Sequence, residues 1–319
     1  MFSIIVPIFD LFDRLVPSGA IQYALEKVLT LEEDFELIAV NNNPTNSCPQ
    51  LTQYLRSLKK CHPEKVKLVE PDMNLGTARG FNAGLRVAQP NSEYLVFMSS
   101  DADIVDPKML GKIYHILVDE PHVGIAHPIS VYEDGEEYNF SSKYSSKAFV
   151  RMIRRQCSLK STEISHAELQ RILDVVSRRN GIKAPLPSFP LTFAVIKRRL
   201  INQIGSFDEG VELGCGEDND LAYRTLLAGF LVARLDGVFV NHRRFLFHNL
   251  CARETNSLPH PEAIKQSRDW WKRKWGRPYI ELYTRWRFGS FLFTIMLPYF
   301  WLRRFASFIK RMLKRFGIW

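Results

Sequence analysis

The N-terminal part of the chain alternates between short apolar runs and longer segments in which apolar residues recur every three or four positions. The runs predict strands that are buried on both faces, and the segments predict amphipathic helices. The predicted strands are residues 2–9, 36–40, 66–69 and 94–98. The predicted helices between them are residues 21–29, 51–58 and 77–87. This alternation is typical of an α/β fold with a mostly parallel central sheet flanked by helices.

The pattern changes in the middle of the chain and then returns. Residues 141–183 carry 10 Lys and Arg against 3 Asp and Glu and have a helical period, which predicts an inserted helical lobe or flap. After it, residues 189–196 and 231–240 predict further strands, and residues 221–227 predict a helix. We therefore assign residues 1–263 to one α/β domain that contains the insertion.

The net charge of +9 is concentrated at the C-terminus. Residues 264–319 hold 14 Lys and Arg against 2 Asp and Glu, together with all six tryptophans. One helical face of this segment is apolar and consists of Leu302, Phe305, Ile309, Met312 and Phe316. A basic amphipathic helix with aromatic residues is typical of a segment that lies on a membrane surface. The alternatives are packing on the protein's own core or in a homodimer; nucleic acid is disfavoured because no nucleic-acid motif accompanies the charge.

Cysteine usage and the chain termini predict where the protein works. The five cysteines are scattered without a CxxC pair, which predicts reduced thiols. The N-terminus lacks the pattern of a signal peptide. The longest nearly uncharged stretch, residues 288–302, is shorter than the ~20 residues that span a bilayer and contains Pro298. We expect a cytoplasmic protein, peripheral on the inner face of the plasma membrane.

Two carboxylates follow the predicted strand at residues 94–98. Asp101 and Asp103 flank Ala102 on a short loop, and such carboxylates suit Mg²⁺ or Mn²⁺ that also binds substrate phosphate. A solvated turn is the simpler interpretation of this motif on its own. Because ligands of open α/β sheets bind outside the carboxyl ends of the strands, we expect Asp10 and Asn41 to converge with the two carboxylates.

Residues 74–84 place small residues and Arg79 at the start of a helix, where backbone N–H groups favour a phosphate. The segment is neither a Walker A loop nor a dinucleotide fingerprint. Taken alone, its glycines are more typical of turns and close packing.

Residues 216–220 place three acids at the start of another predicted helix. Their simplest role is to complement the helix dipole, but a carboxylate here also suits a general base. His242, at the end of the last predicted strand, is the histidine that best suits a metal ligand, although a structural role is commoner for a lone histidine.

Together, these segments resemble the inverting glycosyltransferases of family 2, which have a GT-A fold, and particularly the bacterial members that build O-antigen and related cell-surface polysaccharides, including rhamnosyltransferase-like ones. The similarity covers about residues 2–245. The two opening strands of the family match residues 3–10 and 38–43. The N-x-G motifs match Asn74, Gly76, Asn82 and Gly84, and the DxD motif matches Asp101 and Asp103. A late block matches Gly205, Phe207, Asp208, Glu209, Glu217, Asp218, Asp220, Leu221, Arg224, Ala228 and Gly229.

The resemblance implies transfer of a sugar from a UDP- or dTDP-sugar to a lipid-linked glycan acceptor. It implies that Asp103 and His242 hold Mn²⁺ or Mg²⁺, and that Asp101 contacts the ribose or shares the metal. It implies that Asp218 is the general base and that Glu217 orients the acceptor. The implied nucleotide-sugar contacts are Pro7, Ile8, Asp10, Asn41, Asn74, Arg79, Asp101 and Ala102. A single carboxylate at the anomeric carbon implies one displacement with inversion.

Two positions depart from the family pattern. Asn41 stands where many relatives have an Asp that accepts from the pyrimidine ring N–H, and Phe81 stands where many have an Arg. Two alternatives are therefore kept: a sugar nucleotidyltransferase, and a catalytically degenerate membrane-bound scaffold that binds sugar nucleotides. The nucleotidyltransferase is disfavoured because the N-terminal strand is not followed by a Gly-rich loop containing Arg or Lys.

Overall fold

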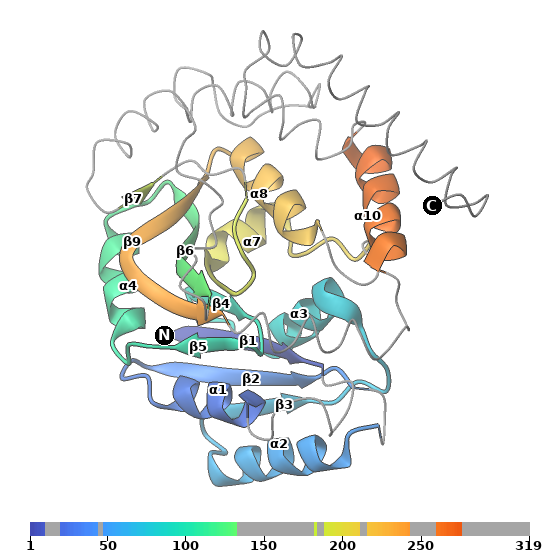
Figure 1. Cartoon of the computed structure of the whole chain (residues 1–319). Helices are drawn as coiled ribbons and strands as arrows, with labels where there is room; N and C mark the ends of the chain where they lie inside the picture. The colour runs from blue at the N-terminus through green and yellow to red at the C-terminus, as the bar shows by residue number, and fades with distance from the viewer. Residues whose placement is uncertain are drawn as a thin grey trace, which may run out of the picture.

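The computed structural model describes residues 1–9, 20–43, 47–132, 182–183, 188–210, 216–242 and 260–275 (Figure 1). Within these ranges the strands are β1 (Phe2–Ile8), β2 (Phe35–Asn41), β3 (Val66–Val69), β4 (Tyr94–Met98), β5 (Ala102–Ile104), β6 (Val123–Tyr132), β7 (Ile182–Lys183), β8 (Phe193–Lys197) and β9 (Leu231–His242). The helices are α1 (Ala20–Leu29), α2 (Pro49–Cys61), α3 (Gly76–Val87), α4 (Met109–Val118), α7 (Arg198–Ile204), α8 (Glu217–Leu227) and α10 (His260–Trp275).

The described strands form one curled sheet in the order β3-β2-β1-β4-β8-β6-β9-β5, with β7 paired to β9 (Figure 1). Strands β1 to β4 are mutually parallel, as the alternation of strands and helices predicts. Strand β8 runs antiparallel to both β4 and β6, whereas β6 and β9 are parallel. Strand β5 is antiparallel to β9. The sheet is therefore mixed: β1 to β4 form one parallel part, and β6 and β9 form a second parallel pair.

Both faces of the central strands are buried, which explains why these strands are continuously apolar. Along β1, Ile4 and Val6 belong to one hydrophobic layer and Ile5 to the other. The first layer packs against α1, α2 and α4, and the second against α3 and α7. Each such side chain contributes about 1.5–3 kcal/mol when it is removed from water. The two layers fix the sheet and hence the positions of the strand ends.

Helix α10 packs on this domain, alongside α8 (Figure 1). Trp270 and Trp271 are 7% and 2% exposed and belong to the core. The boundary expected between residues 263 and 264 thus lies inside a helix of the domain, and these two tryptophans are core residues and not membrane contacts. None of the described helices is long and apolar enough to cross a membrane.

Several predictions concern residues outside the described ranges. They are Asp10, all but the last two residues of the insertion at 141–183, and the amphipathic face at 302–316.

Candidate active site

The DxD segment and His242 meet at the ladder between β5 and β9. In this ladder Ala102 lies opposite His242, and Asp103 lies opposite Asn241. The Oδ2 atom of Asp101 is 3.3 Å from Nε2 of His242. The other ring nitrogen of His242, Nδ1, lies 3.2 Å from Oγ1 of Thr192. Two side chains from distant parts of the sequence therefore contact the imidazole of His242.

The donor atoms in this region suit a hard divalent cation. Asp101 and Asp103 are both buried and supply carboxylate oxygens, and His242 supplies an imidazole nitrogen, a combination that Mn²⁺ accepts. Among the described residues, no group of three His, Cys, Asp or Glu side chains is placed to hold a metal by itself. A cation bound here would therefore need oxygens of water or of a ligand to complete its coordination.

A pair of carboxylates opens α8. Glu217 and Asp218 occupy the first turn of this helix after Gly216, whose φ of 129° is rarely adopted by other residues. The Asp218 carboxylate accepts hydrogen bonds from the backbone N–H and side-chain amide of Asn219, at 2.7 and 2.9 Å. Glu217 is 6% exposed, and none of the described groups hydrogen-bonds to its Oε2.

Burial changes the acidity of both carboxyls. It raises the pKa of Glu217 to about 8, and the neighbouring Asp218 acts in the same direction. Burial also raises the pKa of Asp218, to about 6, against the opposing effect of the Asn219 hydrogen bond. Asp218 is therefore the carboxyl that ionises first, while Glu217 keeps its proton near neutral pH. This order suits a base at Asp218 and a hydrogen-bond donor at Glu217.

The segment 188–192 connects the two groups of acids. Ser188 lies beside Asp218 and lowers its pKa, and Thr192 contacts His242. Four residues span at most about 14 Å. The carboxylate pair of α8 and the Asp101–His242 pair therefore each contact the same short segment of the chain.

The third acid of α8 has a different role. Asp220 is fully buried and accepts from Nε of Arg224 at 2.8 Å. The same guanidinium donates to the carbonyls of Ile204 and Ser206, at 2.8 and 2.7 Å. Asp220 and Arg224 therefore join α8 to the turn after α7, so Asp220 has a structural role that its two neighbouring acids do not share.

The small residues of α3 serve turns and close packing. Gly76 has a φ of 72°, and its N–H donates to Oδ1 of Asn74 at 2.8 Å. A Cβ at Gly84 would lie 2.3 Å from Cγ2 of Ile5, and a Cβ at Gly80 would lie 3.1 Å from Cβ of Pro7. The packing interpretation of these glycines is confirmed.

Arg79 faces the turn that follows α7. Its guanidinium lies 4.0 Å from Oε2 of Glu209 and is 43% exposed. Asn82 donates to the same Glu209 carboxylate and to the Phe207 carbonyl, both at 2.9 Å. Phosphate contacts by Asn74 and Arg79 stay predictions.

Asn42 joins the ends of β1 and β2 to the start of α3, a role that was not predicted. Its backbone N–H donates to the Ile8 carbonyl at 2.7 Å. Its side chain donates to the Gly76 carbonyl at 3.0 Å and accepts from the Leu75 N–H at 2.9 Å. Pro7 and Ile8, expected at the nucleotide, therefore end β1 beside the start of α3.

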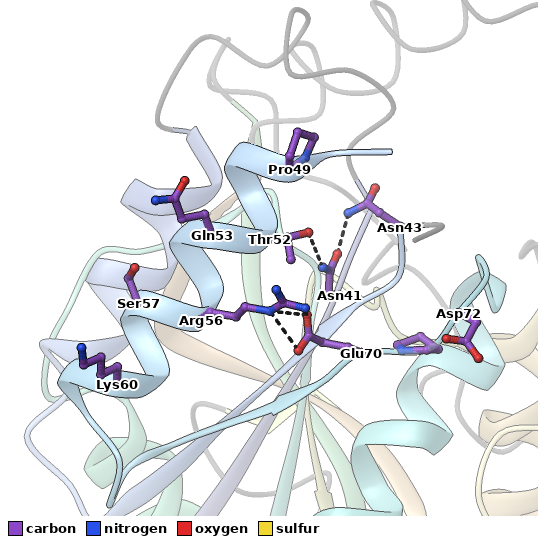
Figure 2. Close-up of a pocket in the computed structure, with 11 residues that line it drawn as sticks. Asn41, Asn43, Pro49, Thr52, Gln53, Arg56, Ser57, Lys60, Glu70 and Asp72 are labelled. Carbon is purple, nitrogen blue, oxygen red and sulfur yellow. Dashed lines mark hydrogen bonds and ion pairs between the residues drawn. The ribbon is translucent and has the colours of Figure 1, made fainter. Parts of the chain in front are cut away.

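A polar cavity of about 480 Å³ lies at the ends of β2 and β3, against α2 (Figure 2). It is lined by Asn41, Asn43, Pro49, Thr52, Gln53, Arg56, Ser57, Lys60, Glu70, Pro71 and Asp72. The amide of Asn41 donates to Oγ1 of Thr52 at 3.0 Å and accepts from Asn43 at 2.8 Å (Figure 2). Asn41 is thus held in one orientation at the cavity. Thr52 lies inside the helix predicted at residues 51–58, but the apolar pattern that predicts this helix does not indicate that Thr52 contacts Asn41.

Comparison with known proteins decides the family. The profile of glycosyl transferase family 2 matches residues 3–204, well over half of the chain. The chain belongs to glycosyl transferase family 2. The match includes Asp101 and Asp103 and ends before α8, so Asp218 and His242 rest on the structure and on the motif resemblance.

The similar proteins agree with this assignment. The minor teichoic acid biosynthesis protein GgaA of Bacillus subtilis (strain 168) is 30% identical over 141 residues, which are 43% of this chain and 29% of GgaA. The aligned part thus spans less than a third of that relative. A structure of GalNAc-T7 with UDP, GalNAc and Mn²⁺ has a TM-score of 0.54 at 13% identity and covers 76% of this chain and 43% of that one. A structure of S. aureus TarS residues 1–349 has a TM-score of 0.49 at 16% identity and covers 86% of this chain and 72% of that one. The family and the similarity to GalNAc-T7 together identify the fold as GT-A.

Proposed function

We propose that the chain is an inverting glycosyltransferase that moves a sugar from a nucleotide-sugar to a hydroxyl of a cell-surface glycan. The observation that carries the proposal is that the short segment 188–192 contacts two unlike groups, the Asp218 carboxyl and the Asp101–His242 pair. Asp101 and His242 offer oxygen and nitrogen ligands, and Asp218 offers a carboxylate poised to ionise near pH 6. A transferase of this kind needs both, because it must stabilise a departing diphosphate and remove one proton.

The chain's own residues account for the proton and the orientation of the acceptor. Asp218 takes the proton of the acceptor hydroxyl. At the same time the hydroxyl oxygen bonds to the anomeric carbon, and the bond from that carbon to the diphosphate breaks. Glu217, protonated near neutral pH, donates a hydrogen bond to the acceptor. With one carboxylate at the anomeric carbon, the displacement inverts its configuration. A divalent metal bound beside Asp101, Asp103 and His242, with phosphate or water oxygens completing its coordination, would supply positive charge to the diphosphate.

The cavity at Asn41 is the place we propose for the base of a UDP- or dTDP-sugar. It lies at the carboxyl ends of β2 and β3, where α/β sheets bind nucleotides. The carbonyl of Asn41 retains a lone pair beside its bond to Asn43 and can accept from a ring N–H without a charge.

The name of GgaA supports a teichoic acid or related lipid-linked glycan as the acceptor. The basic segment beyond Trp275 supports work at the inner face of the plasma membrane, because anionic lipid attracts Lys and Arg. Sedimentation with anionic liposomes tests this part: the full chain should sediment and a chain lacking residues 289–319 should not. Equal sedimentation of both would contradict it.

The activity itself is tested by incubating the purified full chain and Mn²⁺ with a panel of nucleotide-sugars and lipid-linked glycans. We expect nucleoside diphosphate release that depends on the acceptor. Pyrophosphate release from a nucleoside triphosphate would indicate the nucleotidyltransferase instead. Tight nucleotide-sugar binding without release from any donor would indicate the inactive scaffold.

A further inference from the structure

Helix α10 contacts the helix that carries the catalytic carboxylates along one face. A Cβ at Gly216 would lie 3.3 Å from Oγ of Ser267 in α10. One turn further along α8, Asp220 accepts a hydrogen bond from Trp275 of α10. Two turns further along, the Tyr223 ring lies 5.1 Å from the Trp271 ring, edge to face. Because residues 216, 220 and 223 share one helical face, α10 covers that face and leaves the Glu217–Asp218 turn beside it.

The polar centre of this contact is the Asp220 carboxylate. It is fully buried, two residues after Asp218 in the same helical turn. Its Oδ1 accepts from Nζ of Lys274 at 2.7 Å and from Nε1 of Trp275 at 2.9 Å, and its Oδ2 accepts from Arg224. A buried carboxylate with this many donors is held in one position.

Lys274 also bonds to a second acid on a different segment. Its Nζ lies 2.6 Å from Oδ2 of Asp208, in the turn after α7. Hydrogen bonds from Lys274 and from the Gly210 N–H lower the pKa of Asp208 despite the opposing effect of burial. One ammonium group thus joins α10, the 205–210 turn and the first turn of α8.

We propose that Lys274, with Trp275, is a positioning residue that fixes the direction of the Asp218 carboxylate through Asp220. A misplacement of about 1 Å at a reacting group can cost about 100-fold in rate. A base at Asp218 therefore needs the first turn of α8 to be rigid. The inference rests on the proposed function, because it takes Asp218 to be the base.

The test compares Lys274→Met, Lys274→Arg and the control Lys272→Met in the full chain. Lys272 is exposed on the same helix, so its replacement removes the same charge without touching Asp220. The measurements are kcat, the donor KM and the thermal unfolding midpoint. We expect Lys274→Met to lower kcat about 10-fold or more at a temperature where it is fully folded, with little change in KM. Lys274→Arg should restore most of the rate, and the control should match the wild type.

Two further variants separate the possible failures. If Lys274→Met does not fold, Trp275→Phe keeps the ring packing but removes the N–H that Asp220 accepts, and the same fall in kcat is expected. A wild-type kcat in the folded variant, with only the unfolding midpoint lowered, would overturn the positioning role. Asp218→Asn is measured in parallel. Full activity of Asp218→Asn would overturn the assignment of Asp218 as the base. If Asp218→Asn is inactive while Lys274→Met keeps the wild-type kcat, only the positioning role is overturned.

Discussion

The carboxylate of Asp101 lies 3.3 Å from the imidazole Nε2 of His242, so the acid that precedes β5 and the residue that ends β9 form one pair of possible ligands. The β5–β9 ladder imposes this contact by placing Ala102 opposite His242. A metal site at this pair would therefore depend equally on both strands.

Loss of either member of this pair should weaken metal binding. We expect His242→Ala and Asp101→Asn each to raise the Kd for Mn²⁺ about 10-fold or more in the presence of nucleoside diphosphate, because each removes one donor from a site completed by phosphate. Titration calorimetry measures this Kd. His115→Ala, which changes an exposed histidine on α4, is the matched control. Unchanged Mn²⁺ affinity in both site variants would place the metal elsewhere.

The rate should depend on pH through Asp218. Burial raises the pKa of this carboxyl to about 6, and a base acts only when it is ionised. We expect kcat/KM to rise tenfold per pH unit below about pH 6 and to level off above it. The measurement is a pH profile at constant free Mn²⁺. An acidic limb centred near pH 4, the ordinary value of an aspartate, would contradict the assignment.

Ionisation of the buried Glu217 carboxyl should lower the free energy of unfolding at high pH. Burial and the adjacent Asp218 raise its pKa to about 8, whereas the unfolded chain ionises a glutamate near pH 4.3. Between these values the unfolded state binds fewer protons than the folded state, so the free energy of unfolding falls as the pH rises. Glu217→Gln should therefore be more stable than the wild type at pH 8 by on the order of 1 kcal/mol, with the difference smaller near pH 4.

Urea denaturation at the two pH values checks this prediction. Glu64→Gln, at an exposed position, is the control and should show no such pH-dependent gain. A Glu217→Gln variant that is less stable than the wild type at pH 8 would show that the ionised carboxylate is stabilised by its surroundings.

The first half of the fold could be predicted closely because its signals are local. The strand at Tyr94–Met98 and the helix ending at Val87 follow directly from an apolar run and from periodicity. The direction of β8 and the pairing of β5 with β9 could not be predicted, because periodicity does not indicate which distant segment pairs with a strand.

The site shows the same division. The acids at strand ends and at the start of α8 were found because their residue types and positions suggest chemistry. Asp220 could not be distinguished from Asp218 in sequence, because the difference depends on Lys274 of α10. Asn42 was passed over beside Asn41, since three adjacent asparagines at a strand end give no sign of which one joins α3.

The most direct test of the proposed chemistry is the turnover rate of Asp218→Asn at saturating donor, acceptor and Mn²⁺. Asn keeps the shape and most hydrogen bonds of the side chain but cannot take a proton. We expect kcat of Asp218→Asn to fall about 100- to 10,000-fold, with nucleotide-sugar binding retained. Asp269→Asn, at an exposed position on α10, should leave kcat unchanged. A wild-type rate in Asp218→Asn would contradict the central claim that this carboxylate is the base.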